Sequence, residues 1–157
     1  TVRMVEGRQP KRVVIDGPGE LPRHLNLFSD AYEARTLRVG WAPGNDPLLS
    51  LLDAHSFAGQ TITVGQWDGH TDLSEAIDRL GALKMSSVLV ESGGTLATAL
   101  LKRRLVDKVH VFVSPSFLGG GKRSVLGLGL DRLSEKLELR ATEVETVGGD
   151  VLITGYF

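Results

Sequence analysis

The stretch from 87 to 101 constrains the fold of this 157-residue chain more than any other. It opens with an apolar, valine-rich run, which predicts a buried strand at 87–91 with both faces of its sheet covered. The run ends at Glu91 and is followed by two glycines, after which an alanine- and leucine-rich segment predicts a helix at about 94–104. A strand, a glycine turn and a helix in this order are typical of an α/β domain.

The same stretch has an arrangement that binds anions. Backbone N–H groups in the first turn of a helix have no partner within the helix, and ligands bind beyond the carboxyl ends of strands in open α/β sheets. We therefore expect a cofactor phosphate on 93–95, with Glu91 beside it facing a substrate. The alternative is a tight connection in which the glycines only relieve steric crowding, and the local sequence leaves both interpretations open.

The remaining elements follow from hydrophobic periodicity and turn residues. We expect one domain over 1–157, an α/β fold of three layers (α/β/α) with a mixed, mostly parallel central sheet and a C-terminal antiparallel hairpin. The glycine-rich segment 117–130 is predicted to be a functional or surface loop. The other predicted strands are 12–16, 36–42, 60–65, 109–113, 136–147 and 151–157, and the other predicted helices are 47–55 and 72–83.

The predicted helix at 72–83 has a clear start and a clear apolar face. Asp72 and Glu75 have the spacing of a capping box, in which two side chains satisfy N–H groups at the start of a helix. The apolar face is expected to pack on the sheet. It consists of Leu73, Ala76, Ile77, Leu80 and Leu83.

The composition argues against several classes of partner. A formal net charge of −1 gives no basic surface for nucleic acid, and no apolar run approaches the roughly 20 residues that a membrane span requires. The absence of cysteine excludes disulfides and fits a reducing, cytoplasmic location, and Thr1 opens no signal-peptide pattern. We expect no metal, because the histidines are scattered without i, i+4 partners; they are His24, His55, His70 and His110.

Two other motif interpretations fail on specific residues. Ser92 lies on a strand-to-helix turn, like the nucleophile of a serine hydrolase, but Val90 stands where that motif requires glycine. The segment 119–124 partly matches a triphosphate-binding loop, but Arg123 separates Lys122 from the hydroxyl residue. The segment still fits a glycine-rich loop that carries two cations near a ligand phosphate.

Several motifs, in order along the whole chain, resemble one family. They resemble the pyrimidine reductase domain of riboflavin biosynthesis, which has a dihydrofolate-reductase-like fold. The motifs are Thr-Val-Arg at 1–3, Arg-Val-Val-Ile-Asp at 12–16, Val-Glu-Ser-Gly-Gly-Thr-Leu at 90–96, Leu-Val-Asp-Lys at 105–108, Pro-Ser-Phe-Leu-Gly-Gly at 115–120 and Asp-Val-Leu at 150–152.

The resemblance implies NADPH-dependent reduction of a ribosylamino-pyrimidine 5′-phosphate to its ribitylamino form, with hydride delivered to C1′ of the opened sugar. It implies that Glu91 and Arg3 contact the substrate, with the guanidinium of Arg3 on the substrate phosphate. It also implies a homodimer, and it identifies no catalytic residue. The residues implied to bind the cofactor are Gly17, Gly93, Gly94, Thr95, Leu96, Ala97, Thr98 and Ala99.

The chain also departs from the family pattern. Gly17 stands where the family has a hydroxyl residue, which leaves the backbone N–H for the cofactor. The family's opening strand with its Ser-x-Asp-Gly turn, its first helix and its Asp-Asp-Pro segment are not found before Thr1, so we expect a processed or truncated piece.

Three functions therefore stay open. They are the reductase, a reductase-like domain that binds nucleotide without catalysis, and a reductase of another pterin- or folate-like substrate. Within the first, the sequence does not distinguish a diaminopyrimidinone from an aminouracil substrate.

Overall fold

The computed structural model resolves the chain into two compact units, Thr1–Ser87 (the N-terminal unit) and Val88–Phe157 (the C-terminal unit). None of the helices in the described residues has the length and apolar character of a membrane span. The predicted helix at 47–55 lies outside the described residues. The residues that the structure describes are 6–22, 24–41, 61–117 and 119–157.

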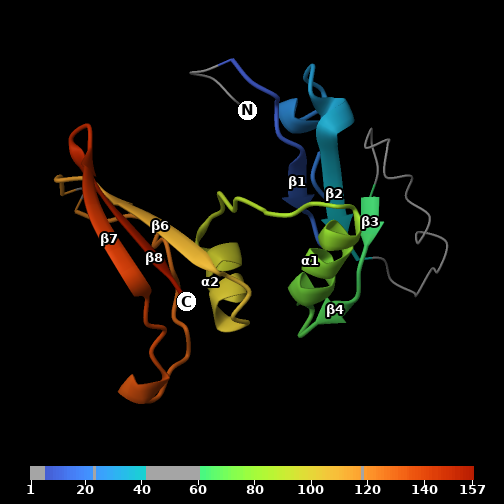
Figure 1. The fold of residues 1–157 in the computed structure, drawn as a ribbon. Helices are drawn as coiled ribbons and strands as arrows, with labels where there is room; N and C mark the ends of the chain where they lie inside the picture. The colour runs from blue at the N-terminus through green and yellow to red at the C-terminus, as the bar shows by residue number, and fades with distance from the viewer. Residues whose placement is uncertain (1–5, 23, 42–60, 118) are drawn as a thin grey trace. The chain divides into compact units, whose positions relative to one another are not determined.

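The N-terminal unit is built on a parallel sheet of three strands in the order β1, β2, β3 (Figure 1). β1 (Arg12–Ile15) pairs with β2 (Thr36–Gly40), and β2 pairs with β3 (Thr61–Thr63). β2 is buried along its whole length, as expected for the central strand of a parallel sheet. The three strands confirm the first three strands predicted from the sequence.

Helix α1 (Leu73–Ala82) packs against this sheet and completes the core of the unit (Figure 1). Its residues Ala76 and Leu80 are buried in one cluster with Leu37 of β2. The prediction that Ile77 belongs to the buried face is wrong, because Ile77 is 37% exposed. Successive helix residues are about 100° apart, so Ile77 lies beside the buried stripe instead of on it.

Side chains close the start of α1. Asp72 is the N-cap, and its carboxylate accepts hydrogen bonds from the N–H groups of Ser74 and Glu75 at 3.0 and 3.2 Å. This confirms half of the predicted capping box. The other half differs, because the N–H of Asp72 donates to the carbonyl of Gly65, and the carboxylate of Glu75 accepts a hydrogen bond from the N–H of Gly65 at 2.7 Å.

A short hairpin that the periodicity does not predict precedes α1. β4 (Gln66–Trp67) and β5 (His70–Thr71) pair in the antiparallel sense. The two residues between them, Asp68 and Gly69, have φ values of 51° and 73°, as a type I′ turn requires. Asp-Gly is the sequence signal of this turn, but strands of two residues are too short to show alternation.

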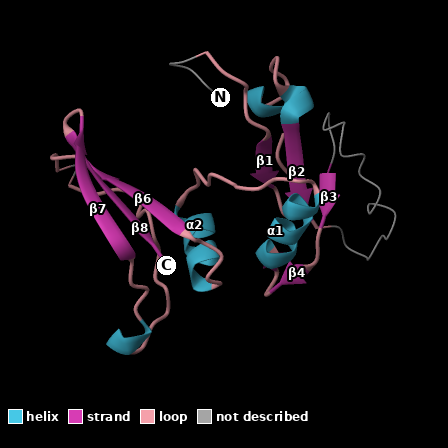
Figure 2. Cartoon of the chain, viewed as in Figure 1, coloured by secondary structure: helices cyan, strands magenta, loops and turns pink. Residues whose placement is uncertain are grey.

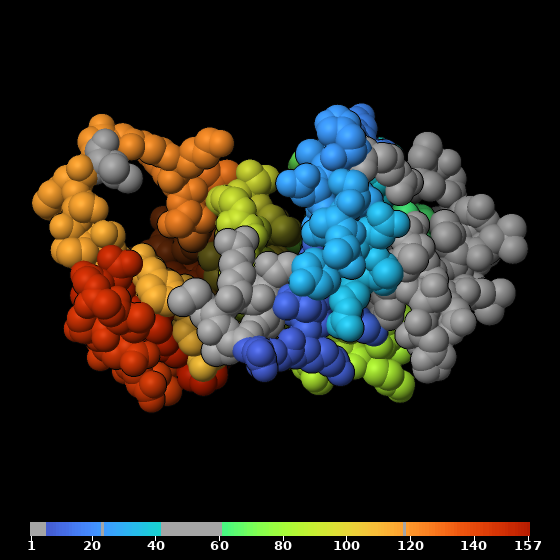
Figure 3. Space-filling model, turned by 90° about the horizontal axis from the view of Figure 1, so that it is seen from above, coloured from blue at the N-terminus to red at the C-terminus, as the bar shows by residue number. Residues whose placement is uncertain are grey.

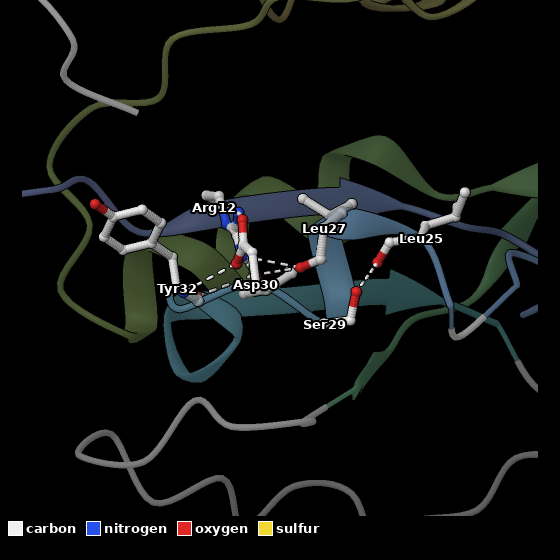
Figure 4. Close-up of polar contacts among 7 residues, drawn as sticks. Arg12, Leu25, Leu27, Ser29, Asp30 and Tyr32 are labelled. Carbon is white, nitrogen blue, oxygen red and sulfur yellow. Dashed lines mark hydrogen bonds and ion pairs between the residues drawn. The ribbon is translucent and has the colours of Figure 1, made fainter.

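Arg12, at the start of β1, ties the irregular segment between β1 and β2 to the sheet (Figure 4). Its guanidinium forms an ion pair with Asp30 at 2.6 Å and donates hydrogen bonds to the carbonyl of Leu27 and the hydroxyl of Thr36. The segment contains two short helical turns. The two turns are the 3₁₀ helices η1 (Asn26–Phe28) and η2 (Glu33–Arg35).

In its described residues, the C-terminal unit contains one α-helix and an antiparallel sheet of three strands in the order β6, β8, β7. The helix and β6 confirm the elements predicted at 94–104 and 109–113. β7 and β8 form the predicted C-terminal hairpin, although β7 begins later than the predicted 136. The elements are α2 (Gly94–Lys102), β6 (Lys108–Val113), the 3₁₀ helix η4 (Leu133–Glu135), β7 (Arg140–Val147) and β8 (Asp150–Tyr156).

The predicted strand at 87–91 is not formed, because these residues run as a loop into α2 (Figure 2). Val88, Leu89 and Val90 are 47, 79 and 46% exposed. A strand requires a neighbour that takes up its backbone hydrogen bonds, and no other described segment pairs with this one. Valine and leucine favour a buried strand, but a buried strand forms only where neighbouring strands and helices cover these side chains.

We expect Asp30→Asn to lower the melting temperature at neutral pH and to have little effect in acid. The side-chain hydrogen bond from Arg12 lowers the pKa of Asp30 below its ordinary value of 3.8. A carboxyl group with a lowered pKa in the folded state stabilises the fold above its unfolded-state pKa, and this contribution is lost as the pH falls through the folded-state pKa. Thermal unfolding of both proteins at neutral pH and at successively lower pH measures the effect. A difference in Tm that persists unchanged below the folded-state pKa contradicts it.

Candidate functional site

The N-terminus of α2 is the part of the C-terminal unit that best suits an anion. Its N-cap, Gly93, makes no side-chain capping hydrogen bond, and the first turn contains no acidic residue. Gly93 and Thr95 are exposed. The first N–H groups of a helix have no acceptor within the helix and lie at the positive end of its dipole. This end of α2 therefore has the chemistry to receive a phosphate group.

Glu91 and the predicted cofactor residues lie on one continuous segment, with Glu91 two residues before the N-cap. Glu91 is exposed, like Thr95. Thr98, one turn further along α2, is only 6% exposed. The remaining predicted positions on the helix are half-buried; they are Gly94, Leu96, Ala97 and Ala99.

A glycine-rich loop is attached to the first turns of α2. The hydroxyl oxygen of Thr98 accepts a hydrogen bond from the N–H of Leu126 at 2.7 Å. A Cβ atom added to Gly94 would overlap the carbonyl oxygen of Arg123. The loop itself is largely exposed and runs over the surface, where it is drawn in orange (Figure 3).

The sequence does not predict either contact between the loop and α2. Their only signal is a glycine and a threonine four residues apart, which places Gly94 and Thr98 on one face of the helix. The prediction of a surface loop at 117–130 is confirmed for its described residues, which contain no helix or strand.

Gly17 lies in the N-terminal unit, two residues after the end of β1. Its carbonyl accepts a hydrogen bond from the N–H of Trp41 at 2.8 Å. A Cβ atom added to Gly17 would lie 2.8 Å from Nε1 of Trp41 and 3.0 Å from the hydroxyl oxygen of Thr71. The glycine therefore allows the indole of Trp41 to pack against the backbone, and a side chain here would displace it.

A buried ion pair lies beside Gly17. Asp16 and Arg38 are 6 and 7% exposed, and Oδ2 of Asp16 lies 2.7 Å from Nη2 of Arg38. The carboxylate of Asp16 also accepts hydrogen bonds from two N–H groups of the turn that follows β1. Arg38 donates to the carbonyl of Leu21 in the same turn. The pair thus fixes this turn, and with it the backbone of Gly17, against β2.

The predicted site residues belong to different parts of the chain. Gly17 is in the N-terminal unit, and Glu91 is in the C-terminal unit with the residues of α2. Arg3 lies outside the described residues, so its contact with a substrate phosphate stays a prediction. Within the described ranges, no group of three or more histidine, aspartate or glutamate side chains is arranged to hold a metal ion.

Comparison with known proteins identifies relatives along the whole chain. The model of one family, the RibD C-terminal domain, matches residues 1–153. The riboflavin biosynthesis protein RibD of Escherichia coli (strain K12) is 36% identical over 152 residues, which cover 93% of this chain and 38% of that protein. The 2,5-diamino-6-ribosylamino-4(3H)-pyrimidinone 5′-phosphate reductase of Methanothermobacter thermautotrophicus is 27% identical over 149 residues, which cover 94% of this chain and 66% of that protein. The chain therefore spans well under half of the length of the Escherichia coli protein.

A solved structure shows the same fold. Form 2 of Acinetobacter baumannii RibD superimposes with a TM-score of 0.70 at 19% sequence identity, and the match covers 99% of this chain and 41% of that chain. At this identity the likeness is evidence for the fold alone. It confirms the predicted mixed α/β fold of the dihydrofolate-reductase-like class, with a parallel sheet and antiparallel strands.

We expect Gly94→Ala to be less stable than Gly93→Ala by about 1–2 kcal/mol, because the added methyl group meets the carbonyl oxygen of Arg123. Gly93→Ala is the matched control, since an added Cβ there has nothing within 4 Å and the φ of Gly93 is −73°. Urea unfolding gives the free energy of unfolding of each variant. Equal values for the two variants are incompatible with the close approach at Gly94.

Proposed function

Because the chain belongs to the RibD C-terminal domain family, we propose that it reduces a ribosylamino-pyrimidine 5′-phosphate to the ribitylamino form with NADPH. The family consists of pyrimidine reductases of riboflavin biosynthesis, so the chain is an oxidoreductase by descent. The observation that carries the proposal is the open N-terminus of α2, preceded by Glu91. A dinucleotide cofactor carries phosphate groups, which such a helix N-terminus can bind.

The residues at the start of α2 fit a cofactor phosphate. The N–H groups of Gly94, Thr95 and Leu96 lie in the first turn, and neither a capping side chain nor an acidic residue competes for them. When bound, the nicotinamide supplies the hydride. The backbone N–H of Gly17 stays a predicted cofactor contact, as the family resemblance implies.

Glu91 is proposed to bind the pyrimidine substrate, not the cofactor. An exposed carboxylate accepts hydrogen bonds from hydroxyl and amino groups, both of which a ribosylamino-pyrimidine carries. Arg3 is proposed to pair with the 5′-phosphate, for which a guanidinium group is well suited. A homodimer, which the family resemblance implies, and a cytoplasmic location, which fits the absence of cysteine, complete the proposal.

The full-length protein that contains this chain should oxidise NADPH when the ribosylamino-pyrimidine 5′-phosphate is added. Loss of absorbance at the nicotinamide band measures the rate, and mass spectrometry identifies the ribitylamino product. Comparing the diaminopyrimidinone and the aminouracil as substrates decides between the two. NADPH binding without turnover of either favours a domain that binds nucleotide without catalysis, and the absence of both binding and turnover refutes the proposal.

We expect Glu91→Gln to lower kcat/KM for the pyrimidine by about tenfold or more, because a hydrogen bond to a charged group contributes about 1.5–3 kcal/mol. The Kd for NADPH should stay within about twofold, since the cofactor binds to backbone N–H groups. Glu143→Gln is the control, because Glu143 is an exposed carboxylate on β7 of the same unit. Unchanged kinetics of Glu91→Gln would remove Glu91 from the site.

A further inference from the structure

We infer that Thr98 is a positioning residue, whose hydroxyl holds Lys122 and Arg123 beside the start of α2 so that these cations serve a phosphate bound there. The inference rests on the proposed function, because it concerns the same helix N-terminus. The resemblance assigns Thr98 to the cofactor itself. The structure gives its hydroxyl oxygen a different partner, in the glycine-rich loop.

The hydroxyl of Thr98 acts inside the protein. Thr98 is 6% exposed, and its oxygen accepts the hydrogen bond from the N–H of Leu126 at 2.7 Å. The hydrogen bond is partly buried, and a bond of this kind contributes about 0.5–1.5 kcal/mol, so it holds Leu126 against the helix. Because the oxygen is buried and engaged, Thr98 acts on a ligand through the loop and not by direct contact.

A second contact brings the loop to the helix terminus. Gly94 is one turn before Thr98 on the same face, and the carbonyl oxygen of Arg123 takes the space that a Cβ of Gly94 would need. Both ends of the segment 123–126 are therefore fixed to α2, at Gly94 and at Thr98. The end that carries Arg123 touches the helical residue next to the N-cap.

This attachment brings the backbone of a loop that carries two cationic residues to a helix end that is itself positive. Lys122 and Arg123 are exposed on the loop, and the first turn of α2 has no acidic residue. Cations carried by a loop that is attached at the positive end of a helix dipole are repelled by that end unless an anion binds there. A phosphate ester carries the negative charge that all three groups attract.

The phosphate ester has two sources, the cofactor and the pyrimidine substrate, and they differ in measurable ways. NADPH carries a 2′-phosphate that NADH lacks, so cations on that phosphate affect the affinity for NADPH alone. Cations on the pyrophosphate affect the affinities for both dinucleotides. Cations on the 5′-phosphate of the pyrimidine change the KM of the substrate and leave the Kd of NADPH unchanged.

The test compares Thr98→Val, which keeps the shape of threonine without its hydroxyl, with Thr98→Ser, which keeps the hydroxyl, in the full-length protein. We expect Thr98→Val to speed amide hydrogen exchange at Leu126. We also expect it to weaken phosphate-ester binding about fivefold, the equivalent of one hydrogen bond of about 1 kcal/mol. Thr98→Ser should restore both values. Calorimetric titration gives the Kd for NADPH and for NADH, and steady-state kinetics give the KM of the pyrimidine. Together these values distinguish the 2′-phosphate, the pyrophosphate and the 5′-phosphate of the substrate as the group that the cations contact.

A second variant tests the charges without altering the helix. Lys122→Gln combined with Arg123→Gln changes two exposed side chains, and we expect it to weaken the same ligand while exchange at Leu126 stays unchanged. If NADPH affinity, NADH affinity and pyrimidine KM are unchanged in both this variant and Thr98→Val, the inference is overturned and the proposed function stands. If the unmutated protein binds no NADPH, the proposed function fails and the inference fails with it.

Discussion

The N–H groups that a helix leaves unpaired at its start constrain both units of this chain. At α1 two of these groups donate to Asp72, and the carboxylate of Glu75 accepts a hydrogen bond from the N–H of Gly65, between β3 and β4. That end of the helix is capped by a side chain of the protein, and the helix packs against the sheet. At α2 the corresponding position is Gly93, which makes no side-chain cap. The need of these N–H groups for an acceptor is therefore met by a side chain of the protein in one unit, and it leaves a position for an anion in the other.

Close approach of a neighbouring group to a glycine backbone organises the surroundings of both candidate regions. At Gly17 the missing side chain lets the indole of Trp41 lie against the turn after β1, and at Gly94 it lets the carbonyl of Arg123 reach the first turn of α2. A backbone that is already in contact needs little further ordering when a ligand arrives, which reduces the entropy that binding must overcome. Each glycine thus leaves room for a neighbouring group, the indole of Trp41 at Gly17 and the carbonyl of Arg123 at Gly94.

The sequence predicts those features that depend on local pattern. Alternation and turn residues predict the strands of the N-terminal sheet and the C-terminal hairpin, and Asp72 predicts the start of α1. The predicted strand at 87–91 is wrong, because a valine-rich run specifies burial but not the neighbour that must pair with it. The hydrogen bond between Thr98 and Leu126 joins residues 28 apart, and no periodicity reports a contact of that kind. The candidate site was therefore predictable as a segment, while its supporting loop was not.

The ion pair between Asp16 and Arg38 limits how this protein can change through evolution. Both groups are buried, so replacing either one alone leaves a charge without its partner in a place that water scarcely reaches. Replacing both with apolar residues of similar size avoids that cost, but the N–H groups of the turn after β1 would then lose the carboxylate that accepts them. The two positions are therefore expected to vary together, and to do so only when the turn changes with them.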